Sequence, residues 1–272
     1  MLELLQYDFM QRALLAGALV GLVCSVVGVF VVLRGISFIG DGIAHSALAG
    51  IAGGLFLGVP PLFAAFIFCS FMACVMGYAS RSGRLKEDTS IGIFFAASMA
   101  LGVVLMGMLK GGSLDLLSFL FGSVLTISDY DLYVSLSFTI IVLVLVLLLY
   151  KEFVAIVFDE ELARISGLPV RFLQYLMFVM IALTVVASLR VAGIVLVSAL
   201  IVTPAATAMQ LSRDIDRITL ISGVCGILSV EAGLMLSYYL DASPGATIVL
   251  FATSLFLLSL VWRQVRAGLL KP

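Results

Sequence analysis

Apolar runs, each long enough to cross a lipid bilayer, recur along this sequence from near its first residue to near its last. A run of about 18 or more such residues indicates a transmembrane helix, because a helix satisfies its own backbone hydrogen bonds in lipid. Charged residues make up 11% of the chain, against roughly 25% in a soluble domain. The sequence therefore predicts an all-α, polytopic transmembrane helical bundle.

We predict about nine spans. They cover residues 12–33, 36–58, 60–79, 91–109, 130–150, 171–189, 192–211, 218–240 and 245–262. No stretch between them has the length and polarity of a separate soluble domain. Residues 1–272 are therefore predicted to form a single integral membrane domain.

The basic residues predict the orientation, because an odd number of spans puts the two termini on opposite sides of the membrane and cytoplasmic loops are enriched in lysine and arginine. With a cytoplasmic C-terminus, 12 of the 15 basic residues face inward: Arg34, Arg81, Arg84, Lys86, Lys151, Arg164, Arg171, Arg213, Arg217, Arg263, Arg266 and Lys271. The net charge of −1, without a basic patch, gives no indication of nucleic-acid binding.

The second span carries two polar residues that are costly to bury. Asp41 and His45, the only histidine of the chain, are four positions apart and so share one helix face. Ionisable residues inside a membrane generally mark an ion path or a binding site. Glu231 lies near the middle of the eighth span, and Asp241 ends that span before the turn sequence DASPG.

Asp41, His45, Glu231 and Asp241 together offer one nitrogen and several oxygen donors, a mixture that suits a divalent ion such as Zn²⁺ or Mn²⁺. A proton relay, or a buried pair that only orients a helix, is the alternative. Asp241 also has the simpler interpretation of a turn or helix-cap residue.

Residues 157–170, between the fifth and sixth spans, have the pattern of a short capped helix. Asp159 is placed to cap it, Glu160 and Glu161 fall in its first turn, and Gly167 ends it just before Pro169. Such a helix, which also carries Arg164, either rests in the headgroups or docks onto a soluble partner at the inner surface. We favour docking.

Two further features are a short apolar segment between the fourth and fifth spans and a proline in the seventh span. Residues 116–127 are apolar but too short to span, so we interpret them as a re-entrant or interfacial helix flanked by the acidic residues Asp115, Asp129 and Asp131. Pro204 in the seventh span permits a hinge, although ordinary packing of the small residues around it is the simpler interpretation.

No enzyme motif is found. GxSxG and HExxH are absent, and no P-loop is present, so any use of ATP requires a separate subunit. We therefore expect a protein that is not an enzyme and binds no resident cofactor.

The sequence resembles the integral permease subunits of bacterial zinc and manganese ABC importers. The specific stretches are GDGIAHSAL, VTPAATA and YYLDASPGATIVL, and further similarity, including RLKEDTSIGI, LFGSVLTIS and GLPVRF, extends from the first span to the last. The resemblance implies a homodimer in the inner membrane, two cytoplasmic ATP-binding subunits and an external solute-binding protein that delivers the metal. It implies that Asp41, His45 and Asp241 line the metal path and that 159–167 is the coupling helix, whereas Glu231 is assigned only by its depth.

These observations predict a permease for a divalent metal ion, with a slight preference for zinc over manganese or iron. Two other classes stay open. A proton-coupled secondary carrier would work without ATP and would show inverted repeats, which the hydropathy pattern does not indicate. A permease for metal chelates needs a wide cavity, for which the chain is short and rich in carboxylates.

Overall fold

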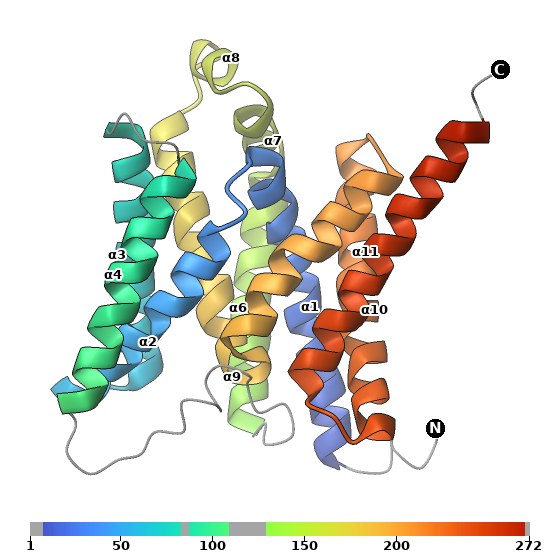
Figure 1. The fold of residues 1–272 in the computed structure, drawn as a ribbon. Helices are drawn as coiled ribbons and strands as arrows, with labels where there is room; N and C mark the ends of the chain where they lie inside the picture. Colours follow the sequence, from blue (N-terminus) through green and yellow to red (C-terminus); the bar gives the residue numbers. More distant parts are fainter. Residues whose placement is uncertain (1–7, 83–86, 109–128, 270–272) are drawn as a thin grey trace.

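The computed structural model describes residues 8–82, 87–108 and 129–269, and within these ranges every regular element is an α-helix. The helices are α1 (Asp8–Arg34), α2 (Ile39–Leu57), α3 (Pro61–Ser82), α4 (Glu87–Met108), α6 (Asp129–Leu148), α7 (Tyr150–Phe158), α8 (Glu160–Ile165), α9 (Val170–Leu211), α10 (Ile215–Leu240) and α11 (Pro244–Leu269). The predicted all-α fold is confirmed (Figure 1).

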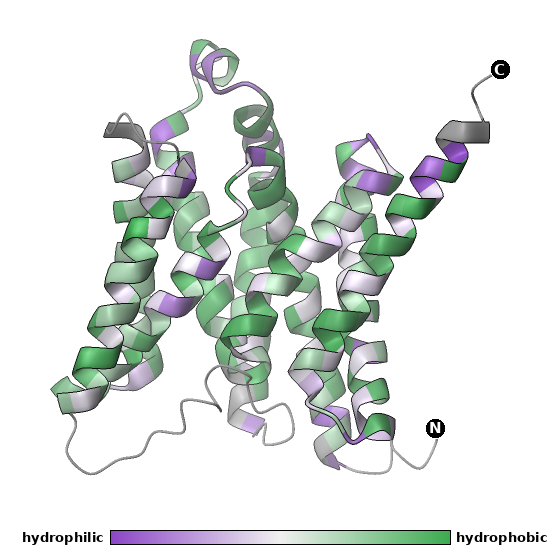
Figure 2. Ribbon diagram, in the orientation of Figure 1, coloured by the Kyte–Doolittle hydropathy of each residue, from purple (hydrophilic) through white to green (hydrophobic). Residues whose placement is uncertain are grey.

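The described residues contain eight helical stretches that are long and apolar enough to cross a membrane, or nine if α6 and α7 together form one bent span. Their sequence ranges agree with the predicted spans to within a few residues. Apolar residues dominate the bundle along its length, and polar residues gather toward its two ends (Figure 2).

The fifth predicted span, 130–150, differs in its shape. The apolar segment continues to Phe158, but the chain bends by 67° between Leu132–Leu148 and Tyr150–Phe158. Leu149, between the two helices, has φ −109° and ψ 19°, outside the helical region. The short helix α7 lies at the end of the molecule that carries α8 (Figure 1), and its Phe153 is buried against Phe30 of α1.

The helix α9 comprises the sixth and seventh predicted spans. Both of its ends lie at the same end of the molecule, so the chain reverses inside this element (Figure 1). The reversal is at Gly193, whose φ of 74° and ψ of 168° are the only non-helical dihedrals within α9. A positive φ of this kind favours glycine. Pro204 lies inside the second half without interrupting the helix, so the structure places the break at Gly193 and not at Pro204.

The core of the bundle is the packing of α1 and α9 on each other and of α1 on α10. Small residues allow close approach at these crossings. A Cβ atom at Gly28 would collide with the backbone carbonyl of Ile201, and one at Gly21 would lie 2.7 Å from the carbonyl oxygen of Gly226. On its other side α9 packs on α2, which in turn packs on α3 and α4.

The two ends of the molecule differ in what they carry. The helix α8, the α9–α10 turn and the C-terminal end of α11 lie at one end, and the start of α1 and the α10–α11 turn lie at the other (Figure 1). At that second end Arg12 and Asp129 form an ion pair of 2.9 Å between Nε and Oδ1. The predicted re-entrant segment 116–127, with Asp115, lies outside the described residues.

Candidate metal site and coupling segment

The helix α2 places the two polar residues of the second span. Its sequence alternates small and apolar residues, and 13 of its 19 residues are buried against α3, α4 and α9. It ends at Gly58, whose φ of 68° gives a left-handed C-cap. Asp41 lies in the first turn of α2, where the positive end of the helix dipole favours a carboxylate.

Asp41 and His45 point toward each other. The Oδ1 atom of Asp41 lies 3.6 Å from Nε2 of His45, and it accepts a hydrogen bond of 3.0 Å from the hydroxyl of Ser198 on α9. The side chain of Asp41 is 40% exposed and that of His45 17% exposed. Both side chains therefore remain partly accessible, and the carboxylate of Asp41 is held by Ser198.

Packing fixes the imidazole of His45. The ring of Phe95, on α4, meets it edge to face with 4.8 Å between ring centroids. One residue further along α2, the buried hydroxyl of Ser46 donates to the backbone carbonyl of Gly42 at 2.7 Å and to the hydroxyl of Ser98 at 2.8 Å. These contacts hold α2 against α4 and leave the imidazole few alternative orientations.

The separation of the two donor atoms suits a shared ion. Two ligand atoms that each lie about 2.1 Å from one metal ion are about 3.0–3.5 Å apart, close to the 3.6 Å between Asp41 and His45. Within the described residues, no group of three or more histidine, cysteine, aspartate or glutamate side chains is arranged to hold a metal. The pair can therefore supply two ligands of a larger set.

The other two predicted ligands lie elsewhere in the chain. Glu231 is half-buried on α10, a helix that packs on α1, α9 and α11. Asp241 is the exposed C-cap of α10, with φ 49° and ψ 43°, and its backbone N–H donates within the cap to the carbonyl of Ser237. The structure brings Asp41 and His45 together, but it does not bring Glu231 or Asp241 to them.

Residues 157–170 have the predicted local structure of a short capped helix. The carboxylate of Asp159 accepts hydrogen bonds from the backbone N–H groups of Glu161 and Leu162, at 3.0 and 2.9 Å, and so caps α8. Gly167 has φ 84°, and the N–H of Leu168 donates to the carbonyl of Ala163, which completes a left-handed C-terminal cap.

Two side chains tie α8 to its surroundings. The carboxylate of Glu160 accepts from Arg164 at 3.1 Å and from the amide of Gln174, on α9, at 2.7 Å.

The apolar side chains of Leu162 and Ile165, 62% and 78% exposed, point away from the chain at the end of the molecule. An exposed apolar surface on a short, rigidly capped helix is typical of a docking site for another protein.

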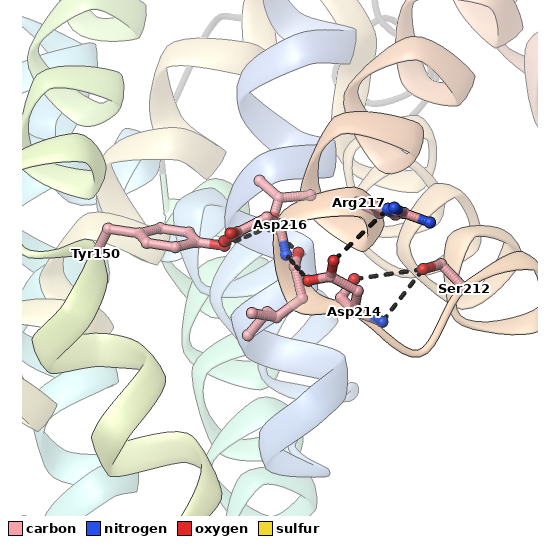
Figure 3. A network of polar contacts seen from close by, with 7 residues as sticks. Tyr150, Ser212, Asp214, Asp216 and Arg217 are labelled. Carbon is pink, nitrogen blue, oxygen red and sulfur yellow. Dashed lines mark hydrogen bonds and ion pairs between the residues drawn. The ribbon is translucent and has the colours of Figure 1, made fainter.

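A polar network joins α7 to the start of α10 (Figure 3). The hydroxyl of Tyr150 donates to the Oδ1 atom of Asp216 at 2.7 Å, across from one helix to the other. Asp214, the N-cap of α10, accepts from the backbone N–H of Asp216 and pairs with Arg217 at 3.6 Å. The helix α8 is thereby linked to α10 through the adjoining helix α7, and to α9 through Gln174.

The sequence did not identify Ser198 or the Tyr150–Asp216 contact. Ser198 and Asp41 are 157 positions apart, and a single serine in an apolar span resembles any packing residue. Its only signal is that small polar residues in spans form hydrogen bonds between helices.

Comparison with known proteins agrees with the fold. The model of the ABC 3 transport family matches residues 6–263. The chain is 39% identical over 257 residues to the manganese transport system membrane protein MntC of Halalkalibacterium halodurans, covering 94% of this chain and 88% of that protein. It is 35% identical over 266 residues to a probable iron transport system membrane protein of Haemophilus influenzae, covering 98% of each.

The structure is also similar to a solved one. PsaBC from Streptococcus pneumoniae in complex with Fab contains a chain that superimposes with a TM-score of 0.85 at 35% identity, covering 94% of this chain and 92% of that one. The likeness extends over nearly the whole bundle.

Proposed function

The chain belongs to the ABC 3 transport family, and from this premise we propose that it is the membrane permease subunit of an ATP-driven importer for a divalent transition-metal ion. The observation that carries the proposal is the Asp41–His45 pair, with donor atoms 3.6 Å apart on a membrane-embedded helix. A carboxylate and an imidazole suit first-row divalent ions, and a small ligand set lets a transported ion leave again.

Manganese is the first ion to test. The relatives described above are named for manganese and for iron, and neither is named for zinc. The preference for zinc drawn from the sequence therefore has no support from these relatives. Ligand chemistry alone does not separate the three ions, because imidazole and carboxylate groups bind all of them.

We propose further that two copies of the chain form the transport path. One copy supplies two donor atoms at Asp41 and His45, and a divalent ion takes four to six ligands. A second copy related by a two-fold axis would double the set. Asp241, at the end of the molecule opposite α8, fits a role where the ion enters, and Glu231, ten residues earlier on α10, fits a role deeper in the membrane.

The segment 157–170 is proposed as the contact for an ATP-binding subunit. The helix α8 presents Leu162 and Ile165 at the same end of the molecule as the C-terminus, the end that the distribution of basic residues assigns to the cytoplasm. ATP-driven closure of two such subunits would move α8, and through Gln174 and Tyr150 this motion would reach α9 and α10. A solute-binding protein at the opposite end would deliver the ion.

The test is uptake into vesicles that contain this chain, its ATP-binding subunit and its solute-binding protein. Radiolabelled Mn²⁺, Fe²⁺ and Zn²⁺ are compared with and without ATP. The proposal predicts ATP-dependent accumulation, highest for Mn²⁺. Equal uptake without ATP and without the partner subunit would instead identify a carrier that works alone.

A further inference from the structure

A polar hollow, distinct from the candidate metal site, lies where α9, α10 and α11 meet at the end of the molecule that carries α8. Its volume is about 460 Å³, within the range of about 300–1,000 Å³ typical of small-ligand sites. Four arginines and one acidic residue line it, together with a tryptophan: Arg213, Arg217, Arg263, Arg266, Asp214 and Trp262. We refer to this hollow as the basic pocket.

The charges of the basic pocket are only partly compensated. Arg217 pairs with Asp214 at 3.6 Å, and Arg263 donates to the amide oxygen of Gln210 at 2.7 Å. Among the residues that the structure describes, no carboxylate lies within ion-pair distance of Arg213, Arg263 or Arg266. A pocket with a surplus of positive charge and three guanidinium groups without an acidic partner suits an anion, and guanidinium groups bind phosphate oxygens in a bidentate manner.

The position of the basic pocket indicates where that anion comes from. Arg217 opens the span Ile215–Leu240, and Arg266 closes the span Pro244–Arg266, so both lie where a bilayer has its headgroups. Trp262 on α11 is 62% exposed at the same level, the depth at which tryptophan is enriched in membrane proteins.

Exposed apolar side chains continue from the basic pocket into the membrane. On α10, Leu220, Val224 and Leu228 follow Arg217 at helical spacing and are 71%, 50% and 51% exposed. On α11, Leu258 lies one turn below Trp262 and is 64% exposed. The basic pocket matches the polar headgroup of a phospholipid, and the exposed apolar side chains next to it on α10 and α11 match the acyl chains.

We propose that the basic pocket binds the phosphodiester headgroup of an anionic phospholipid. Arg213 and Arg266 contact the phosphate oxygens, Trp262 packs at the glycerol level, and the acyl chains lie along α10 and α11. Basic pockets between transmembrane helices bind anionic lipids by the same combination of charge and depth. The proposal is independent of the transported ion, and it rests on the helices spanning a bilayer.

The experiment is native mass spectrometry of the purified full chain with added dioleoylphosphatidylglycerol or dioleoylphosphatidylcholine. The variant Arg213→Gln/Arg266→Gln removes two of the three arginines without an acidic partner, and it leaves the Arg263–Gln210 hydrogen bond in place. Lys151→Gln/Arg171→Gln removes the same charge from exposed positions at the same end but outside the pocket, and Arg213→Lys/Arg266→Lys keeps the charge.

The unaltered chain should retain phosphatidylglycerol over phosphatidylcholine. An arginine near an anionic headgroup contributes about five-fold in affinity, so the double glutamine variant should bind phosphatidylglycerol about 25-fold more weakly. The control Lys151→Gln/Arg171→Gln should bind phosphatidylglycerol as the unaltered chain does. The variant Arg213→Lys/Arg266→Lys should keep most of the phosphatidylglycerol binding.

Unchanged phosphatidylglycerol binding in the double glutamine variant would overturn the proposal, as would an equal loss in the Lys151/Arg171 control. Complete displacement of the lipid by millimolar inorganic phosphate would identify a site for free phosphate instead. If the glutamine variant kept its lipid but lost an ATP-binding subunit, the pocket would be a protein-docking surface, and the lipid proposal would be wrong.

Discussion

Three side chains from two helices determine what the candidate site can do. Asp41 and His45 supply an oxygen and a nitrogen donor at a separation that suits one ion, and Ser198 holds the carboxylate by a 3.0 Å hydrogen bond. A carboxylate held in this way reaches its ligating position without first having to be ordered. Ser198 is therefore a positioning residue.

Replacing Ser198 with alanine should weaken ion binding without abolishing it. A hydrogen bond to a charged group contributes about 1.5 kcal/mol or more, which corresponds to roughly ten-fold in the apparent affinity for Mn²⁺. The measurement is the Mn²⁺ concentration that gives half-maximal ATP-dependent uptake.

Thr184→Val is the matched control for Ser198→Ala. The hydroxyl of Thr184 lies on the same helix and donates to the carbonyl of Met180, so its loss should leave the uptake affinity unchanged. An equal change in the uptake affinity of both variants would show that the loss of any hydroxyl on α9 weakens ion binding. Ser198 would then have no special role.

At the scale of single elements, α8 is a six-residue helix that depends on its caps. A helix this short has little intrinsic stability. Asp159 satisfies two N–H groups at its start, and Gly167 provides the left-handed residue at its end. The exposed Leu162 and Ile165 keep their positions only while both caps hold.

Asp159→Ala should therefore reduce the association of an ATP-binding subunit about five-fold, since the loss of an N-cap costs about 1 kcal/mol. Asp159→Asn retains a capping oxygen and should bind as the unaltered chain does. Co-purification at graded concentrations of the subunit measures both variants. Equal behaviour of the alanine and asparagine variants would contradict the capping argument.

The sequence predicted the elements well where local signals determine them. The caps of α8 and the membrane spans follow from side-chain chemistry and from runs of apolar residues. The bend at Leu149 was not predictable, because no proline or glycine marks it. Pro204 was the more conspicuous candidate for a break in α9, yet the helix continues through it, and the chain reverses at Gly193.

At the scale of the whole molecule, close helix crossings hold the bundle together, and they also decide which polar residues meet. Gly28 of α1 packs directly on the backbone of Ile201, in the half of α9 that carries Ser198. The same half reaches α2, so the position of Ser198 against Asp41 depends on how closely α1 and α9 approach.

Gly28→Ala should lower the thermal stability of the purified chain. The added methyl group has no space, and overpacking a core costs about 1–3 kcal/mol, or about 5 °C in Tm for a chain of this size. Gly92→Ala on α4 adds the same methyl group into open space and should leave Tm unchanged or raise it slightly. Two equal decreases would contradict the packing argument.

The assembly of the site was predictable only in part. Asp41 and His45 are four residues apart on one helix, so their proximity follows from helical geometry alone. Contacts between distant segments, such as Ser198 with Asp41 or Tyr150 with Asp216, depend on packing that a single sequence does not reveal. For the same reason, similar depth along two helices did not bring Glu231 to His45.

The central claim is that the Asp41–His45 pair handles the transported ion, and uptake by the His45→Ala variant tests it most directly. The variant is compared with the unaltered chain in vesicles that contain equal, quantified amounts of inserted protein together with both partners. The account predicts that ATP-dependent Mn²⁺ uptake falls at least about 100-fold, because the loss of one of the two ligands in the pair weakens the hold on the ion by about 2.7 kcal/mol or more, while membrane insertion stays intact. Undiminished uptake by correctly inserted His45→Ala protein would contradict it.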